Sequence, residues 1–217
     1  MTPPTVDEAR WPGLFVSFDG PGGVGKSTVI SLLAEVLRGR RLPVHTTTQP
    51  SRTSLGDQIR HGTHTYQGMA LACLVAGDRH HQISTEILPA LHAGAVVLCD
   101  RYLPSSLVLQ RLDGLTTHTV WELNAGVAVP DMAVILTADP SVVAERLNSR
   151  GGHSRFEQLP DASAEELRLY HQAIVELADA GWPLLALDAT DSPEAVADTV
   201  AQQIMTLLEK RSPACPA

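Results

Sequence analysis

The chain has 217 residues, 44% of them hydrophobic and 18% charged, which is typical of a globular protein large enough to bury a substantial core. Its 24 acidic residues outnumber its 16 basic ones, and the net charge of −8 argues against a nucleic-acid polymer or a membrane as its general partner. The three cysteines lack metal-ligand spacing, the N-terminus does not resemble a signal peptide, and no apolar run approaches the roughly 18 residues of a membrane span. We therefore expect a reduced, cytoplasmic protein.

The N-terminal part of the chain carries a strand–loop–helix pattern. Residues 14–18 form a short apolar run suited to a buried parallel strand, and residues 28–37 have helical periodicity. Between them lies Gly20-Pro21-Gly22-Gly23-Val24-Gly25-Lys26-Ser27-Thr28. This stretch matches the pattern of a phosphate-binding loop in the required context, whereas a glycine-rich turn before an ordinary helix is the alternative interpretation.

The residue types of this loop suit a polyphosphate and a divalent cation. Its glycines let backbone N–H groups approach phosphate oxygens, and the following helix directs its positive end at them. We expect Lys26 to reach the β- and γ-phosphates and Ser27 to give its hydroxyl to Mg²⁺. The predicted nucleotide-binding residues are Gly20, Gly22, Gly23, Val24, Gly25, Lys26, Ser27 and Thr28.

Beyond this unit, apolar runs alternate with helical patterns. Further strands are predicted at residues 43–47, 95–99, 133–137 and 183–187. Helices are predicted at residues 54–60, 65–91, 104–113 and 116–125, from 139 through Arg146 and Arg150, at 162–180, and from 192 to about 210. This alternation predicts an α/β fold with a doubly wound parallel sheet.

Two polar stretches stand out in this plan. The run at 95–99 ends in Asp100-Arg101-Tyr102, at the carboxyl edge of a central strand, where open α/β sheets bind ligands. Gly151-Gly152-His153-Ser154-Arg155 is short, flexible and cationic, as expected of a lid over phosphates. These features predict a nucleotide-using P-loop protein and leave a switch, a motor and a kinase open.

Four further segments, together with the P-loop, resemble the thymidylate kinase family of nucleoside monophosphate kinases. In chain order they are Gln49-Pro50-Ser51-Arg52-Thr53, then Asp78-Arg79 with Pro89-Ala90-Leu91, then Asp100-Arg101-Tyr102-Leu103-Pro104-Ser105-Ser106, and Pro130-Asp131 leading through Arg146 and Arg150 to Arg155-Phe156-Glu157. The resemblance covers about residues 14–208.

This resemblance implies a three-layer P-loop kinase fold, in which helices flank a five-stranded parallel sheet, and a homodimer. It implies one kinase domain at 14–211 with a lid at about 150–160, between a flexible segment at 1–13 and a tail at 212–217. The implied activity is the transfer of the γ-phosphoryl group of ATP, with Mg²⁺, to a nucleoside monophosphate, with dTMP as the default acceptor.

The resemblance also implies roles for individual residues. Arg79 and Arg101 would bind the acceptor phosphate, for which a forked guanidinium is suited. Asp100 would organise the magnesium shell or the acceptor, while Arg150 and Arg155 would neutralise charge on the transferred phosphoryl group. The implied catalytic residues are Lys26, Asp100, Arg101, Arg150 and Arg155, and the implied metal ligands are Ser27 and Asp100. The implied acceptor-binding residues are Pro50, Val75, Arg79, Arg101, Ser105, Ser106, Leu109 and Gln110.

Departures from the family pattern lie on the acceptor side. The family usually has an acidic residue at the position of Gly22 and an aromatic residue at that of Val75, and Leu109 occupies a further position where aromatic residues are frequent. The arginine expected before the proline loop is Thr48, followed by Gln49 in place of glutamate. On this interpretation, an acid at Gly22 and an aromatic residue at Val75 should strengthen dTMP binding.

Several alternatives remain open on the sequence alone. The enzyme could be diverted to another phosphorylated or hydroxylated small molecule in specialised metabolism, or the chain could be a regulatory nucleotide-binding switch. Arg79 could be a surface residue, Asp100-Arg101 a plain ion pair at a strand end, and Arg150 and Arg155 part of a solvated basic turn.

Overall fold

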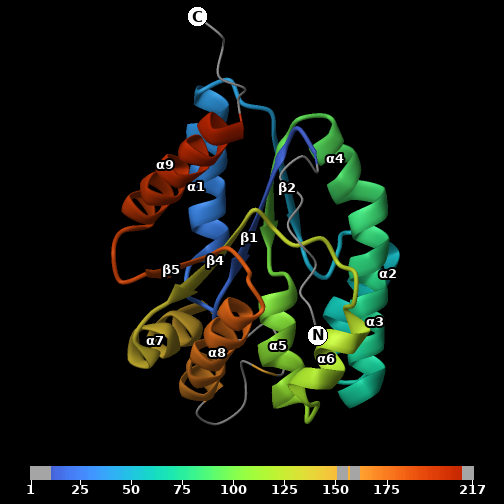
Figure 1. The fold of residues 1–217 in the computed structure, drawn as a ribbon. Helices are drawn as coiled ribbons and strands as arrows, with labels where there is room; N and C mark the ends of the chain where they lie inside the picture. Colours follow the sequence, from blue (N-terminus) through green and yellow to red (C-terminus); the bar gives the residue numbers. More distant parts are fainter. Residues whose placement is uncertain (1–10, 151–155, 157–161, 212–217) are drawn as a thin grey trace, which may run out of the picture.

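The computed structural model describes residues 11–150, 156 and 162–211. In this part of the chain, one five-stranded parallel sheet has the order β2-β3-β1-β4-β5 (Figure 1). The strands are β1 (Leu14–Asp19), β2 (Val44–Thr48), β3 (Val96–Asp100), β4 (Met132–Thr137) and β5 (Leu184–Asp188). The predicted five-stranded α/β sheet flanked by helices is therefore confirmed.

Helices connect the strands and cover both faces of the sheet (Figure 1). The described helices are α1 (Lys26–Gly39), α2 (Ser54–His61), α3 (Gly68–Gln82), the π-helical turn η1 (Ile83–Ile87), α4 (Leu88–His92), α5 (Leu103–Leu112), α6 (Thr117–Leu123), α7 (Pro140–Arg150), α8 (Ala162–Asp179) and α9 (Pro193–Arg211).

The sheet separates two hydrophobic cores. On one face, α1 and α9 pack together over side chains that include Val16 of β1 and Val134 of β4. On the other face, α5 and α8 pack together over side chains that include Phe15 and Ile135. Every residue of β1 is buried because both faces of a central parallel strand are covered, which explains why four of its six residues are apolar.

The long helix predicted at 65–91 differs from expectation in two ways. It begins later, at Gly68, whose N–H donates to Oδ2 of Asp113 at 2.6 Å. It also widens into the π turn η1, where the N–H of Leu88 bonds the carbonyl of Ile83. The reason is Pro89, since a proline inside an α-helix has no N–H to donate and its ring clashes with the preceding turn.

The strand order brings two loops together at one edge of the sheet. β1 and β3 are neighbours, with Phe18 paired to Asp100, so the loop after β1 lies beside the loop after β3. The chain moves to opposite sides of β1 when it enters β3 and β4, which makes this edge a topological switch point. The fold therefore places Gly20 to Lys26 next to Asp100 and Arg101.

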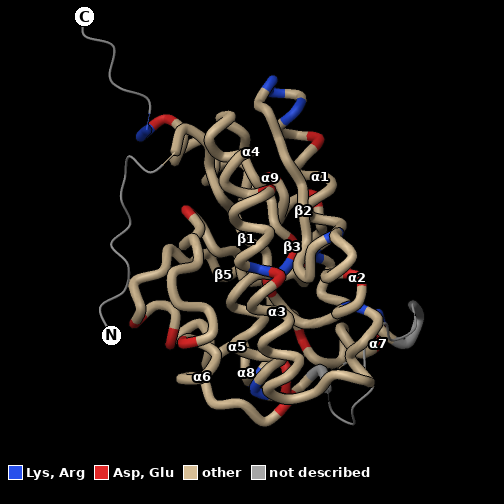
Figure 2. The backbone as a smooth tube through the Cα atoms, turned by 90° about the vertical axis from the view of Figure 1, so that its right-hand side faces the viewer, with Lys and Arg blue, Asp and Glu red and all other residues tan. Residues whose placement is uncertain are grey.

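Charged residues are distributed unevenly along the backbone. Figure 2 shows Lys and Arg gathered at the tip beyond α1 and a mixed acidic and basic group near the middle of the molecule, close to β1 and β3. No described helix combines the length and apolar character needed to span a bilayer. Residues 1–10 of the predicted flexible segment and the predicted tail lie outside the described residues, whereas Trp11 is buried and Gly13 donates to the Leu91 carbonyl at 2.9 Å.

Candidate active site

The P-loop turns tightly between β1 and α1. Gly20 has φ +144°, and a Cβ there would lie 2.2 Å from the carbonyl oxygen of Leu136, so only glycine fits. Gly25 precedes α1 with φ +107°. The backbone conformation at Gly20 and Gly25, and the close approach of Leu136 to Gly20, thus favour glycine at these two positions. The tight turn of the loop depends on these residues of the local sequence.

Lys26 is folded back over its own loop. Its Nζ donates to the carbonyl oxygens of Gly20 and Pro21, each at 2.8 Å, and the residue is only 6% exposed. Burial, together with the charge of Arg101, lowers the pKa of Lys26 to about 7. A polyphosphate beside Nζ would favour the charged form, so this lysine is suited to respond to an anionic ligand.

Ser27 and Asp100 meet at the border of the same loop. The exposed hydroxyl of Ser27 donates to Oδ2 of Asp100 at 2.6 Å, although they come from the start of α1 and the end of β3. A hydroxyl and a carboxylate are hard oxygen ligands of the type that Mg²⁺ prefers, and phosphate oxygens and water would complete its shell. The described residues contain no cluster of three or more His, Cys, Asp or Glu side chains that could hold a metal.

Arg101 has an unusual backbone conformation, with φ +70°. Its N–H donates to the carbonyl of Phe18 at 2.8 Å, which ties it to the end of β1. Its Nη1 atom is buried and, within the described part of the chain, has no hydrogen-bond partner. A left-handed non-glycine residue with a buried, unsatisfied donor is the kind of strained feature found at functional sites.

Acidic groups keep Arg101 charged. Burial acts against the charge, but Tyr170, Glu166 and Asp100 together raise the pKa of Arg101 above its usual value. Burial raises the pKa of Tyr170 itself, so its phenol stays neutral at neutral pH. Arg101 is therefore a permanent cation at the switch point.

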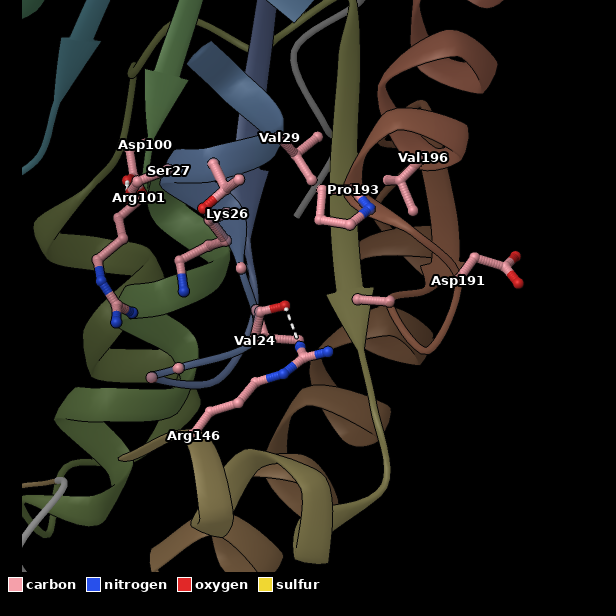
Figure 3. A pocket seen from close by; sticks show the side chains of 15 residues that line it. Val24, Lys26, Ser27, Val29, Asp100, Arg101, Arg146, Asp191, Pro193 and Val196 are labelled. Atoms are coloured by element: carbon pink, nitrogen blue, oxygen red, sulfur yellow. Dashed lines mark hydrogen bonds between the residues drawn. The ribbon is translucent and has the colours of Figure 1, made fainter. Parts of the chain in front are cut away.

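Gly22 to Thr28, Asp100 and Arg101 line one cavity, which we call the donor cavity. Figure 3 shows Lys26 and Arg101 extending into it from α1 and from the residue after β3, while Arg146 approaches from α7 and donates to the carbonyl of Val24 at 3.2 Å. Ala189 also lines this cavity, and Pro193 and Val196, in the first turn of α9, lie at its end remote from Arg101 (Figure 3).

A second cavity, which we call the acceptor cavity, lies between α3, α5 and α8. Every residue assigned to the acceptor by the resemblance lines it: Pro50, Val75, Arg79, Arg101, Ser105, Ser106, Leu109 and Gln110. Phe156 also lines it and belongs to a small hydrophobic cluster against which Val75 and Leu109 pack. Oε1 of Gln110 is buried and, among the described residues, has no partner.

Arg79 lines the acceptor cavity and is only 2% exposed. Its guanidinium donates to Oε1 of Gln49 at 2.7 Å, to Oδ1 of Asn124, to Oγ of Ser106 at 2.7 Å and to the carbonyl of Tyr102 at 3.3 Å. These contacts use most of its five N–H groups. To bind a phosphate, Arg79 would have to exchange partners, whereas Arg101 has a donor to offer; the phosphate role of Arg79 stays a prediction.

Asp19 is a site residue that the sequence reasoning missed. Its fully buried Oδ1 accepts hydrogen bonds from the N–H of Tyr102 at 2.8 Å, the N–H of Ser105 at 2.9 Å and the hydroxyl of Ser105 at 2.6 Å. Burial raises the pKa of Asp19, and the bonds from Ser105 and Tyr102 oppose that rise. The carboxylate thereby fixes the loop that carries Arg101. The available signal was an acid directly between the first strand and Gly20.

Glu166 of α8 was also missed. It is 2% exposed, lines the acceptor cavity, and accepts a hydrogen bond through Oε2 from the N–H of Gly22 at 3.1 Å. It thus brings a carboxylate beside the loop position that lacks one. On a helix of ordinary amphipathic pattern, nothing in the local sequence distinguishes it from Glu165.

The structure does not test the predicted lid. Arg155 and the other residues of 151–155 and 157–161 lie outside the described residues, as does the side chain of Arg150 at the end of α7. Their predicted role at the transferred phosphoryl group stays a prediction.

Comparison with known proteins agrees with this geometry. The family model described as thymidylate kinase matches residues 18–200. The chain is 34% identical over 203 residues to a probable thymidylate kinase of Caldivirga maquilingensis, covering 92% of this chain and 95% of that protein. It is 36% identical over 194 residues to a thymidylate kinase of Leifsonia xyli subsp. xyli, covering 86% and 91%. A probable thymidylate kinase of Pyrobaculum aerophilum is 35% identical over 196 residues, covering 88% and 95%.

Proposed function

The chain belongs to the thymidylate kinase family and is thus a nucleoside monophosphate kinase, and we propose that it transfers the γ-phosphoryl group of ATP to dTMP with Mg²⁺ as cofactor. The observation that carries this proposal is the meeting of the two cavities. Asp100 and Arg101 line both the donor cavity and the acceptor cavity. A phosphate bound in each cavity would meet at these two residues, as an in-line transfer requires.

The donor side supports ATP with Mg²⁺. The loop N–H groups and Lys26 would bind the polyphosphate, and Ser27 and Asp100 would hold the cation. When bound, the metal supplies charge neutralisation for the phosphates. Arg101 would bind the acceptor phosphate through Nη1, which has no partner among the described residues, and hold it toward the donor. Phosphoryl transfer asks little covalent work of the protein, so placed cations account for the catalysis.

The acceptor side supports a pyrimidine such as thymine. Val75, Leu109 and Phe156 form an apolar wall, and the buried Oε1 of Gln110 needs an N–H or O–H donor. The N3–H group of thymine is a donor of this kind, and its methyl group suits an apolar wall. This chemistry favours thymine over cytosine, whose N3 carries no hydrogen.

A panel of acceptors tests the proposal. ADP release is measured with ATP and Mg²⁺ in the presence of dTMP, dUMP, dCMP, dAMP or dGMP, and without acceptor as control. We expect turnover with dTMP to exceed that with every other monophosphate. No turnover with any of them would overturn the proposal, and slow hydrolysis that no acceptor stimulates would favour the regulatory switch.

A second candidate is a family member diverted to another small-molecule acceptor. The supporting observation is the aliphatic character of Val75 and Leu109 together with Thr48, an uncharged residue that lines the acceptor cavity at the place where the resemblance implies an arginine. Turnover with a non-nucleotide phosphate ester, but not with dTMP, would favour this candidate. The homodimer and the cytoplasmic location also stay predictions, and a molar mass measured by light scattering checks the first.

A further inference from the structure

Glu166 is a buried carboxylate at the border between the two cavities. Its partner Gly22 lines the donor cavity, whereas Glu166 itself lines the acceptor cavity. The bond from the Gly22 N–H takes one of about four acceptor positions of a carboxylate. Burying an ionised group is costly unless other groups bind or neutralise it. The Glu166 carboxylate therefore needs further hydrogen-bond donors besides the Gly22 N–H.

The surroundings of Glu166 are cationic. Its negative charge opposes the effect of burial on the pKa values of Arg101 and Lys26. Both cations face the phosphates in the proposed reaction, so they serve anions rather than Glu166 once substrates are bound. The carboxylate then requires a neutral donor, because a phosphate oxygen beside it would be repelled.

The place where the phosphoryl group is transferred identifies this hydrogen-bond donor. The acceptor phosphate lies where the cavities share Asp100 and Arg101. The sugar is joined directly to that phosphate, so it lies just inside the acceptor cavity, at the border where Glu166 stands. A sugar hydroxyl is a neutral donor that a carboxylate binds well. In dTMP the free sugar hydroxyl is the 3′-hydroxyl.

We propose that Glu166 accepts a hydrogen bond from the 3′-hydroxyl of the acceptor nucleotide and thereby selects acceptors that carry this group. The inference rests on the proposed function and adds a specificity-determining residue to it. A site built to bind a hydroxyl rejects the analogue that lacks one, because its buried polar group is then left unpaired. The competing explanation is that Glu166 only holds the Gly22 N–H and so shapes the P-loop.

Two acceptors and three variants separate these explanations. kcat and KM are measured with dTMP and with 3′-deoxythymidine monophosphate for the wild type, Glu166→Ala, Glu166→Gln and the control Glu165→Gln. Glu165 is adjacent in sequence, but its side chain is about 44% exposed and pairs with Arg168. Thermal unfolding of each variant checks that the fold is kept.

We expect the wild type and Glu165→Gln to prefer dTMP by about 10- to 100-fold in kcat/KM, the range of a hydrogen bond to a charged group. Glu166→Ala should reduce this preference to less than about 3-fold, mainly through the KM for dTMP, and Glu166→Gln should lie between. The proposal is overturned if the wild type shows no preference, or if Glu166→Ala slows both acceptors by the same factor.

Failure of the proposed function gives a different result. If the wild type turns over another nucleotide rather than dTMP, the same comparison is made with that nucleotide and its 3′-deoxy analogue. The role of Glu166 is then decided independently of the base that the enzyme prefers.

Discussion

Ser27 and Asp100 are 73 positions apart in the chain, yet the Ser27 hydroxyl donates to the Asp100 carboxylate at 2.6 Å. The contact exists because β1 and β3 are adjacent strands that end at the same edge of the sheet. It joins the donor loop to the residue that borders both cavities. Most functional contacts in this protein have this long-range character.

Asp100→Asn should weaken the use of Mg²⁺ more than the binding of ATP. An amide keeps the shape of the side chain but removes the charge that a hard cation prefers. We expect the Mg²⁺ concentration needed for half-maximal ADP release to rise by about 10- to 100-fold. An unchanged Mg²⁺ dependence would mean that Asp100 serves only to hold Ser27. Asp179→Asn, at an exposed position at the end of α8 that lines neither cavity, is the control.

Lys26→Ala should abolish transfer and leave the fold intact. In the proposed reaction Lys26 binds the polyphosphate, and burial is unfavourable for its ammonium group, as the lowered pKa of Lys26 indicates. We expect kcat to fall by at least about 100-fold. The melting temperature should change by less than about 4 °C, which corresponds to roughly 1 kcal/mol for a chain of this size. A much larger fall in the melting temperature would mean that Lys26 stabilises the loop.

Arg101→Lys tests the assignment of the acceptor phosphate. Lysine retains the charge but loses the planar fork, and the strained backbone is equally available to both residues. We expect kcat/KM for dTMP to fall by about 100-fold, with little change in the KM for ATP. The exposed Arg38 at the end of α1 provides the control Arg38→Lys. If KM for ATP rises instead, Arg101 serves the donor.

Gly22→Asp distinguishes this chain from the family pattern. Because Glu166 already lies beside Gly22, a second carboxylate would meet a like charge. We therefore expect the KM for dTMP to rise by about 10-fold or more, contrary to what the resemblance alone implies. The double variant Gly22→Asp, Glu166→Gln should recover a large part of that loss. If the KM for dTMP rises equally in the single and double variants, the cause is a change in the loop backbone rather than repulsion between the two carboxylates.

Glu86 gives the protein a stability that depends on pH. Its Oε2 accepts from Gln82 at 2.9 Å, and its Oε1 lies 2.8 Å from Nε2 of His45. Burial acts to raise the pKa of Glu86, but hydrogen bonds from Thr47, Gln82 and His45 outweigh it and lower the pKa below 4.5. A depressed acid pKa stabilises the fold above the unfolded value and loses that contribution as the pH falls through the folded value.

At pH 7, Glu86→Gln should consequently lower the free energy of unfolding by about 0.5–1.5 kcal/mol relative to the wild type. The variant should therefore unfold at a lower urea concentration. The difference should shrink below pH 4.5, where the wild-type carboxyl also becomes neutral. Glu35→Gln, at an exposed position of α1, is the control and should match the wild type at both pH values. A deficit that is independent of pH would contradict the electrostatic origin.

The sequence by itself determined the sheet, the P-loop and many of the residues that line the two cavities. These features depend on local patterns: apolar runs for β1 and β3, glycine spacing for the loop, and short motifs for Arg101 and Gln110. The resemblance placed eight residues in the acceptor cavity, and all of them line it. The π turn of η1 was not predicted, although Pro89 is a local signal of a break in the α-helix.

Only the tertiary structure decided which side chains share a cavity and which atoms remain to bind a ligand. Asp19 bonds Ser105, and Glu166 bonds Gly22, across 86 and 144 positions. Such pairs depend on strand order and helix packing, so no periodicity in the sequence marks them. Among the described residues, the same packing leaves Nη1 of Arg101 without a hydrogen-bond partner and occupies most of the donors of Arg79. Motifs thus identified the reaction class, whereas packing decided how each charged group can take part in it.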